Sequence, residues 1–289
     1  MLRVQPRVQA ISWMVSSVLF FAIFDALTKY LAADVAVVIL IWSRYVIHSV
    51  IAIAIFFPAR GFTIFRTTRP WAQMLRGLLM LGVSLCMMNA AKYLPLAELT
   101  ALYFTAPLIV LIVSPYIASE PVKWRTLVVA MVGFAGVLFI ARPGGDVTGP
   151  ASILPLVAAF LYAGFQLSTR HFSKTESPVT TNIMTGLVGA VVMSLVLLAA
   201  PPLAWSSISG SDVSMILLLG ASGFLAQMML INALKFDTPA RLAPMSYTQL
   251  LWAALIGYVV FDVVPGMSAL VGMFLIAASG LFLLVRESK

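Results

Sequence analysis

Ten long apolar stretches dominate this chain and constrain its fold more than any other feature. Each has about 17–22 residues, which at about 1.5 Å per helical residue crosses a hydrocarbon core about 30 Å thick. An open sheet cannot satisfy its backbone in lipid, and the alternating pattern of a membrane barrel does not recur. The pattern therefore predicts an all-α membrane protein with ten transmembrane helices, at residues 10–31, 36–57, 72–91, 96–117, 125–141, 150–170, 180–200, 214–235, 242–261 and 267–285.

Composition agrees with a membrane protein and argues against nucleic-acid binding. Hydrophobic residues make up 62% of the 289 positions and charged residues only 10%, whereas a soluble domain carries about 25% charged residues. The net charge of +8 is scattered in ones and twos between the apolar stretches and forms no basic patch. We therefore expect lipid, and no nucleic acid, around this chain.

The distribution of Lys and Arg predicts the orientation. With a cytoplasmic N-terminus, the outer connections hold only Lys29, Lys92 and Arg142. Cytoplasmic connections are the ones enriched in Lys and Arg, so both termini are expected in the cytoplasm. We also expect the membrane to be a bacterial inner membrane. The cytoplasmic set is Arg3, Arg7, Arg60, Arg66, Arg69, Lys123, Arg125, Arg170, Lys174, Lys235, Arg241, Arg286 and Lys289.

The chain also contains an internal repeat. A shift of 143 residues lays NAAKYLPLAELTALYFT (89–105) on NALKFDTPARLAPMSYT (232–248), and a shift of 141 lays FDALTK (24–29) on FQLSTR (165–170). The second alignment pairs Asp25 with Gln166. Two matched blocks in the same order and with nearly the same offset indicate a duplicated unit.

The duplication predicts the topology. Each copy holds five helices, so the first repeat covers residues 1–145 and the second covers residues 146–289. Because five is odd, the copies enter the membrane in opposite directions and form inverted repeats. Secondary transporters use this arrangement to open alternately to each side of the membrane.

The stretch LPLAELTALYFTAPLIVLIVSPYIASEPVKWRTLVVAMVGFAGVLFIARPG (94–144) resembles the five-helix half-repeat of the EamA family, within the drug/metabolite transporter superfamily. In that family a Gly-Glu pair follows the fourth helix and a G-x-x-G-V run fills the fifth; here Ser119-Glu120 and GFAGV (133–137) stand at those places. In the second half, Asp262 replaces the usual Glu and ASG (278–280) stands in for the glycine pair. The resemblance implies ten helices, a central cavity between the halves and ATP-independent movement of a small organic solute.

Motifs of other chemistries are missing from the sequence. No P-loop of the form G-x-x-x-x-G-K-[ST] occurs and no G-x-S-x-G element occurs. Two histidines and the lone Cys86 cannot assemble a zinc site of usual ligation. We expect no enzyme activity, no catalytic residue, no cofactor and no metal.

Charged residues inside the predicted helices are the leading candidates for a solute site, because a charge in the bilayer centre costs at least about 2.5–3.5 kcal/mol. Asp25 and Arg44 lie at similar depth on the first two helices, which predicts an ion pair between them. Lys29 shares the helix face of Asp25, and His48 follows Arg44 by one turn.

Uncharged polar and aromatic residues extend the candidate site. Glutamine offers donors and an acceptor to a solute that loses its water, and tyrosine gives a flat wall. Glu98 is expected in the first turn of its helix, either meeting the helix dipole or acting as an outer gate. The complete set of expected solute-binding residues is Asp25, Arg44, Glu98, Tyr103, Gln166, Gln227, Tyr247 and Gln249.

These observations predict a secondary transporter of a small organic metabolite. A cavity with both an acid and a base favours an amino acid or another zwitterion, and export is the first expectation. The alternative is an importer of a vitamin or cofactor such as riboflavin or S-adenosylmethionine. A polytopic membrane enzyme and a non-transporting scaffold form a different class. A coupling proton and a homodimer stay open.

Overall fold

A computed structural model describes residues 6–32, 34–90, 93–94, 96–117, 122–141, 152–199, 210–262 and 264–286. That part of the chain is helical and contains no strand. Lys92, Ser119, Glu120 and Arg142 lie outside the described residues, as does the side chain of Glu98. The helices are α1 (Pro6–Leu31), α2 (Val37–Arg60), η1 (Gly61–Phe65), α3 (Pro70–Ala90), α4 (Leu96–Tyr103), α5 (Ala106–Ile117), α6 (Trp124–Ala141), α7 (Ile153–Phe172), α8 (Pro178–Ala199), α9 (Gly210–Phe236), α10 (Pro239–Ser246), α11 (Thr248–Phe261) and α12 (Met267–Arg286).

The helices follow the predicted apolar stretches, with two differences. Eight segments of the described chain are long and apolar enough to cross a membrane. The stretch 96–117 was expected as one helix but is divided into α4 and α5, and the stretch 242–261 is divided into α10 and α11.

Proline explains the first of these two breaks. Pro107 has no N–H for the carbonyl of Tyr103, and its ring would clash with that carbonyl in a continuous helix. The chain therefore ends α4 at Tyr103 and starts α5 at Ala106. At the second break, the N–H of Tyr247 bonds to the carbonyl of Pro244 at 3.4 Å, which is a three-residue step. Pro244 itself lies inside α10.

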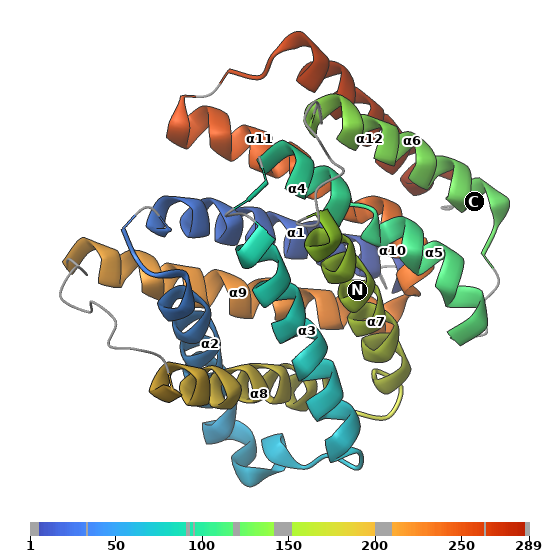
Figure 1. Ribbon diagram of the computed structural model, residues 1–289. Coiled ribbons are helices and arrows are strands. Elements are labelled where there is room, and N and C mark those ends of the chain that lie inside the picture. The colour runs from blue at the N-terminus through green and yellow to red at the C-terminus, as the bar shows by residue number, and fades with distance from the viewer. Residues whose placement is uncertain are drawn as a thin grey trace.

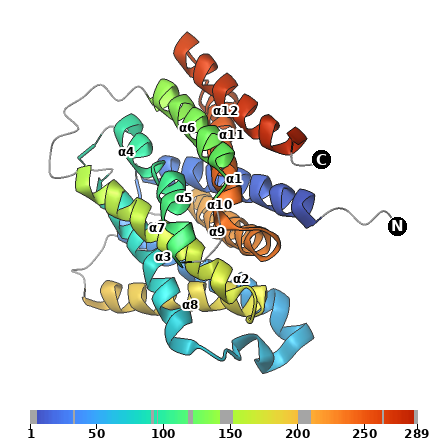
Figure 2. The same ribbon diagram turned by 90° about the vertical axis from the view of Figure 1, so that its right-hand side faces the viewer.

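The helices pack around a centre formed by α1 and α9, which lie side by side in both views (Figures 1 and 2). On one side α2, α3, α7 and α8 form a group in which α2 packs on α8 and α3 packs on α7. On the other side α6 and α12 pack along each other, and α11 lies between them and α1. The short helices α4, α5 and α10 lie between these two groups (Figure 1).

The outer surface suits lipid. Large apolar side chains are exposed on α6, α8, α11 and α12, for example Phe139, Leu195, Val259 and Phe274. Tyr and Trp are enriched at both membrane–water interfaces of membrane proteins. Exposed aromatic residues occupy helix ends in the same way, with Trp71, Tyr116 and Trp124 towards one side and Tyr30, Tyr93 and Tyr258 towards the other.

The contact between α6 and α12 depends on two glycines. A Cβ atom on Gly136 would lie 2.7 Å from the backbone oxygen of Gly272. Such an approach is closed to any larger residue unless the helices separate.

We predict that Gly136→Ala destabilises the protein by about 1–3 kcal/mol, because the added methyl group meets backbone that cannot rotate away. The measurement is the thermal denaturation midpoint of the detergent-purified protein. Gly257→Ala on α11 is the matched control, since a Cβ there has no neighbour within 4 Å. Equal midpoints for the two variants would contradict the close α6–α12 crossing.

Candidate functional site

A cavity of about 460 Å³ lies between α1, α2, α3, α4, α7, α9 and α11. Its lining extends along α1 from Phe21 to Ala32 at the helix end, and along α2 from Val37 to Arg44. Four of the expected solute-binding residues line it, namely Asp25, Arg44, Tyr103 and Gln249. Ligand pockets of drug-sized molecules have volumes of about 300–1,000 Å³, so this cavity admits a solute of cofactor size.

Asp25 presents a carboxylate to the cavity from the middle of the molecule. Asp25 is solvent-accessible because it borders the cavity. Gln249 at the start of α11 donates from Nε2 to Asp25 Oδ2 at 2.7 Å. This hydrogen bond joins α1 of the first half to α11 of the second half across the cavity. The remaining acceptor sites of the carboxylate leave room for a cationic group.

Arg44 supplies the opposite charge. Its Nη1 donates to Ser84 Oγ at 3.0 Å, and its guanidinium lies 4.4 Å from the centre of the Phe24 ring. The expected ion pair with Asp25 is not among the contacts of the described residues, and the prediction of a direct pair is wrong for this structure. Each charge instead has a neutral partner, Gln249 for Asp25 and Ser84 for Arg44.

Aromatic and thioether side chains form the walls. The ring centres of Tyr103 on α4 and Tyr162 on α7 lie 5.7 Å apart, and both residues line the cavity. Met80, Met87 and Met88 of α3 line it as well. Flat rings and polarisable sulfur suit a heterocyclic group.

Three expected residues lie elsewhere. Gln166 and Gln227 are each 1% exposed and Tyr247 is fully buried, and none of the three borders this cavity. Tyr247 packs instead against Phe104 and Phe134.

Sequence reasoning missed several residues that line the cavity. Ser84 is one small polar residue among many in apolar helices, and only the fold shows that it faces Arg44. Tyr162 and Thr28 also line the cavity. Thr28 could have been found from the sequence, because it follows Asp25 by three residues and so shares its helix face.

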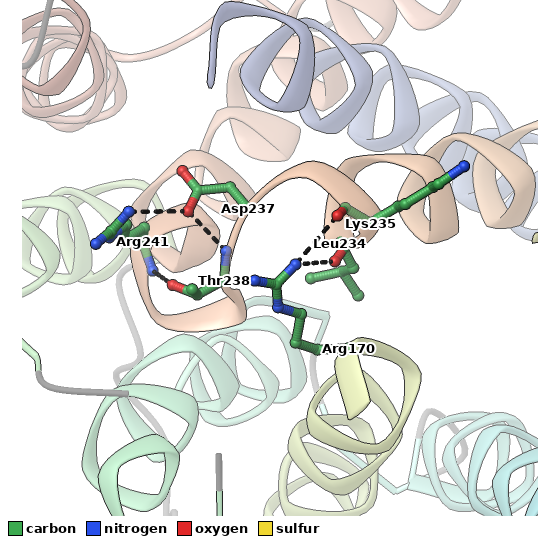
Figure 3. Close-up of polar contacts among 6 residues, drawn as sticks. All are labelled: Arg170, Leu234, Lys235, Asp237, Thr238 and Arg241. Carbon is green, nitrogen blue, oxygen red and sulfur yellow. Dashed lines mark hydrogen bonds and ion pairs between the residues drawn. The ribbon is translucent and has the colours of Figure 1, made fainter. Parts of the chain in front are cut away.

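Away from the cavity, polar contacts join the end of α7 to the end of α9 and cap α10 (Figure 3). Nη1 of Arg170, at the end of α7, donates to the carbonyls of Leu234 and Lys235 at 3.0 and 3.1 Å. These carbonyls end α9, where the helix dipole is negative. Thr238 then caps α10 by accepting from the N–H of Arg241 at 3.2 Å, and Arg241 pairs with Asp237 at 3.4 Å.

Known proteins resemble the chain over nearly its full length. The sequence profile of the EamA-like transporter family matches residues 8–142 and again residues 149–286. An S-adenosylmethionine uptake transporter of Rickettsia felis is 26% identical over 279 residues, which are 96% of this chain and 93% of that protein. A riboflavin transporter of Vibrio cholerae is 27% identical over 287 residues, covering 97% and 94%. A solved crystal structure shares the fold, with a TM-score of 0.83 at 21% identity and coverage of 98% and 99%.

The chain therefore belongs to the EamA-like transporter family. This confirms the resemblance drawn from GFAGV (133–137) and its surroundings, and it makes the protein a multi-pass membrane transporter and not an enzyme. Its partners are a small-molecule solute and membrane lipid.

We predict that Arg170→Gln loosens the contact between the ends of α7 and α9, because it removes the guanidinium donor that joins them. The reporter is Ala233→Cys in a Cys86→Ser background, since Ala233 is buried. We expect Ala233→Cys to react with a thiol reagent about three- to tenfold faster once Arg170 is replaced. A charge-assisted hydrogen bond contributes about 1.5–3 kcal/mol before discounting for partial exposure. Arg125→Gln, an exposed arginine on α6, is the control. An unchanged labelling rate in the Arg170 variant would contradict a role of this contact in holding α7 to α9.

Proposed function

We propose that the protein is a secondary transporter that imports a zwitterionic, cofactor-sized solute of the S-adenosylmethionine type. The observation that carries the proposal is the pair of opposite charges, Asp25 and Arg44, facing one cavity of about 460 Å³. Relatives named for uptake of S-adenosylmethionine support import of a cofactor over the export of an amino acid that the sequence first suggested. The sequence contains no P-loop motif that would bind ATP, so the proposed driving force is a solute or ion gradient.

The proposed binding mode follows from the lining residues. An ammonium or sulfonium group of the solute lies against Asp25, while its carboxylate accepts hydrogen bonds from Arg44. A heterocyclic ring stacks against Tyr103 and Tyr162. Each contact replaces water that the solute loses on entering the membrane, which is why a site in this position needs both charges. A coupling proton would use Asp25, because among the side chains that the structure describes it is the carboxylate that lines the cavity.

We further propose that residues 1–145 and 146–289 are inverted repeats. The family profile matches the chain twice, once in each range. The helix breaks after Tyr103 and after Ser246 lie at positions related by the 143-residue shift. The paired asparagines also act alike, since Asn89 and Asn232 each donate to a carbonyl of the preceding turn at 2.8 Å.

The packing of the helices supports the same symmetry. Exchanging α1, α2 and α3 with α7, α8 and α9 turns the α1–α9 contact into the α7–α3 contact, and the α2–α9 contact into the α8–α3 contact; all four are formed. The short helices depart from this symmetry. α5 packs on α10, but the equivalent contact between α11 and α4 is not among the main contacts of the described helices. An inverted-repeat transporter that is open on one side and closed on the other has this kind of asymmetry.

The orientation that we propose places both termini in the cytoplasm of a bacterium and the protein in the inner membrane, following the positive-inside rule. The cavity then opens outward, and the closed end around Arg170 faces the cytoplasm. The structure then represents an outward-open state.

Riboflavin is the second candidate solute. A riboflavin transporter of Vibrio cholerae is a full-length relative, and the rings of Tyr103 and Tyr162 suit a flavin as well as an adenine. Riboflavin carries no carboxylate for Arg44, so the two candidates differ in their need for that residue.

We predict that proteoliposomes containing the purified protein accumulate radiolabelled S-adenosylmethionine under an imposed gradient, without ATP. Riboflavin and leucine are measured in parallel, and protein-free liposomes are the control. Uptake of leucine but neither of the other two compounds would contradict the proposed solute class.

We predict that Asp25→Asn lowers the kcat/KM of S-adenosylmethionine uptake about tenfold or more, since a lost charge-assisted contact costs about 1.5–3 kcal/mol. Asp34→Asn is the matched control, because Asp34 is an exposed carboxylate just beyond the end of α1 and does not line the cavity. The result that sinks this role is equal activity of the two variants.

A further inference from the structure

A second arginine lies inside the molecule, away from the cavity. Arg76 on α3 has no exposed surface and is the largest fully buried side chain of the described residues. Its Nη1 donates to Thr169 Oγ1 at 2.9 Å and its Nε donates to Gln73 Oε1 at 3.3 Å. Its Nη2 donates to Thr185 Oγ1 and to the carbonyl of Thr181. The guanidinium is thus enclosed by α3, α7 and α8.

The charge of Arg76 has no counter-ion within the described part of the chain. Every acceptor around the guanidinium is a neutral hydroxyl, amide or carbonyl oxygen. Buried charges are normally paired, because transfer of a lone charge from water into a membrane interior is costly. A neutral side chain would avoid the cost of burying a charge here, so the charge of Arg76 points to a second role.

The surroundings of Arg76 match those of Arg44 through the internal repeat. Arg44 lies 4.4 Å from the ring centre of Phe24, and Arg76 lies 4.9 Å from the ring centre of Phe165. The 141-residue shift that aligns the two halves places Phe24 on Phe165. The same shift places Thr28, which lines the cavity, on Thr169, which accepts from Arg76.

The helices around the two arginines match as well. Arg44 lies among α1, α2 and α9, where its Nε is 3.7 Å from a Cβ position on Gly223, and it also reaches Ser84 on α3. Exchanging the halves converts those three helices into α7, α8 and α3, which are the helices around Arg76. The two arginines come from non-equivalent helices and nevertheless occupy equivalent spaces.

Two buried amides of α7 and α8, which are two of the helices that enclose Arg76, carry polar atoms without partners in the described part of the chain. Gln166 is 1% exposed, and neither its Nε2 nor its Oε1 has a hydrogen-bond partner among the described residues. Nδ2 of the fully buried Asn182 on α8 is also unpartnered there. Buried amides are rarely left unsatisfied in a final state. By the repeat, Gln166 stands where Asp25 stands in the open cavity.

We propose that the guanidinium of Arg76, bordered by Thr169 and Thr185, forms a second half-site, which binds the carboxylate of the solute when the transporter opens to the side closed in this structure. In the outward-open state the half-site is held by its own neutral acceptors, and it exchanges them for the carboxylate as α7 and α8 move away from α3. The solute is thereby passed from one buried arginine to another. This inference rests on the proposed transport function and deepens it, because it assigns the solute's anionic group a partner on each side of the membrane.

Cysteine accessibility tests where the half-site opens. In a Cys86→Ser background, Thr28→Cys and Thr169→Cys are exposed to a membrane-impermeant thiol reagent in right-side-out and in inside-out vesicles. We expect Thr28→Cys to react from the outside and Thr169→Cys to react from the inside. Failure of Thr169→Cys to react from the inside, while Thr28→Cys reacts from the outside, would overturn the half-site.

Protection by S-adenosylmethionine tests the role of the charge. Added to the inner side, S-adenosylmethionine should slow the labelling of Thr169→Cys, and Arg76→Gln should raise the concentration needed for half-protection about tenfold or more. Arg76→Lys should raise this concentration less than Arg76→Gln does, and Arg125→Gln should leave it unchanged. The proposal is contradicted if the concentration for half-protection is unchanged in Arg76→Gln protein of normal melting temperature. If Arg76→Gln melts early, the same concentration is measured for Arg76→Lys, and an unchanged value there contradicts the proposal.

The two proposals fail differently. Uptake of S-adenosylmethionine by the unmodified protein, combined with inner labelling that does not depend on Arg76, would overturn the half-site and leave the proposed function intact. Absence of uptake, combined with Arg76-dependent protection on the inner side, would overturn the proposed function while the anion site remains supported.

Discussion

Lipid offers no hydrogen bonds to a protein backbone, and the rest of this structure depends on that constraint. Helices satisfy their own backbone groups, so a helix can break inside the membrane only where protein or a cavity surrounds the break. Both breaks in this chain obey the rule. Phe104, at the first break, is 6% exposed and Tyr247, at the second, is fully buried, and the two rings pack against each other. Tyr103 and Gln249, adjoining these breaks, line the cavity.

The same constraint governs the charges. A membrane protein keeps a charged side chain in its interior only where a partner or water compensates the loss of hydration. Arg44 and Asp25 satisfy this by facing a cavity, whereas Arg76 satisfies it with neutral oxygen atoms from three helices. Two arginines with similar aromatic neighbours and different surroundings are what an inverted repeat would produce when one side is open and the other is closed.

Sequence alone predicted the helical membrane fold, because the length of an apolar stretch is a local property. The break at Pro107 was foreshadowed by the proline, but the break after Ser246 has no proline at the right position. Side-chain partners could not be predicted, since they depend on which helices are neighbours: the Asp25–Gln249 bond joins residues 224 positions apart. Arg76 could have been selected as a candidate from the sequence, because it lies inside the predicted helix 72–91 and the rule that selects intramembrane charges applies to it as well as to Arg44.

The central claim is that one symmetric molecule opens to one side as it closes to the other. The most direct test is the distance between spin labels at two pairs of exposed positions, Tyr93 with Val264 on the cavity side and Tyr116 with Phe236 on the closed side, measured with and without S-adenosylmethionine. The account predicts that the solute shortens the first distance and lengthens the second in the same population of molecules. A solute that is bound and transported while both distances stay fixed would contradict it.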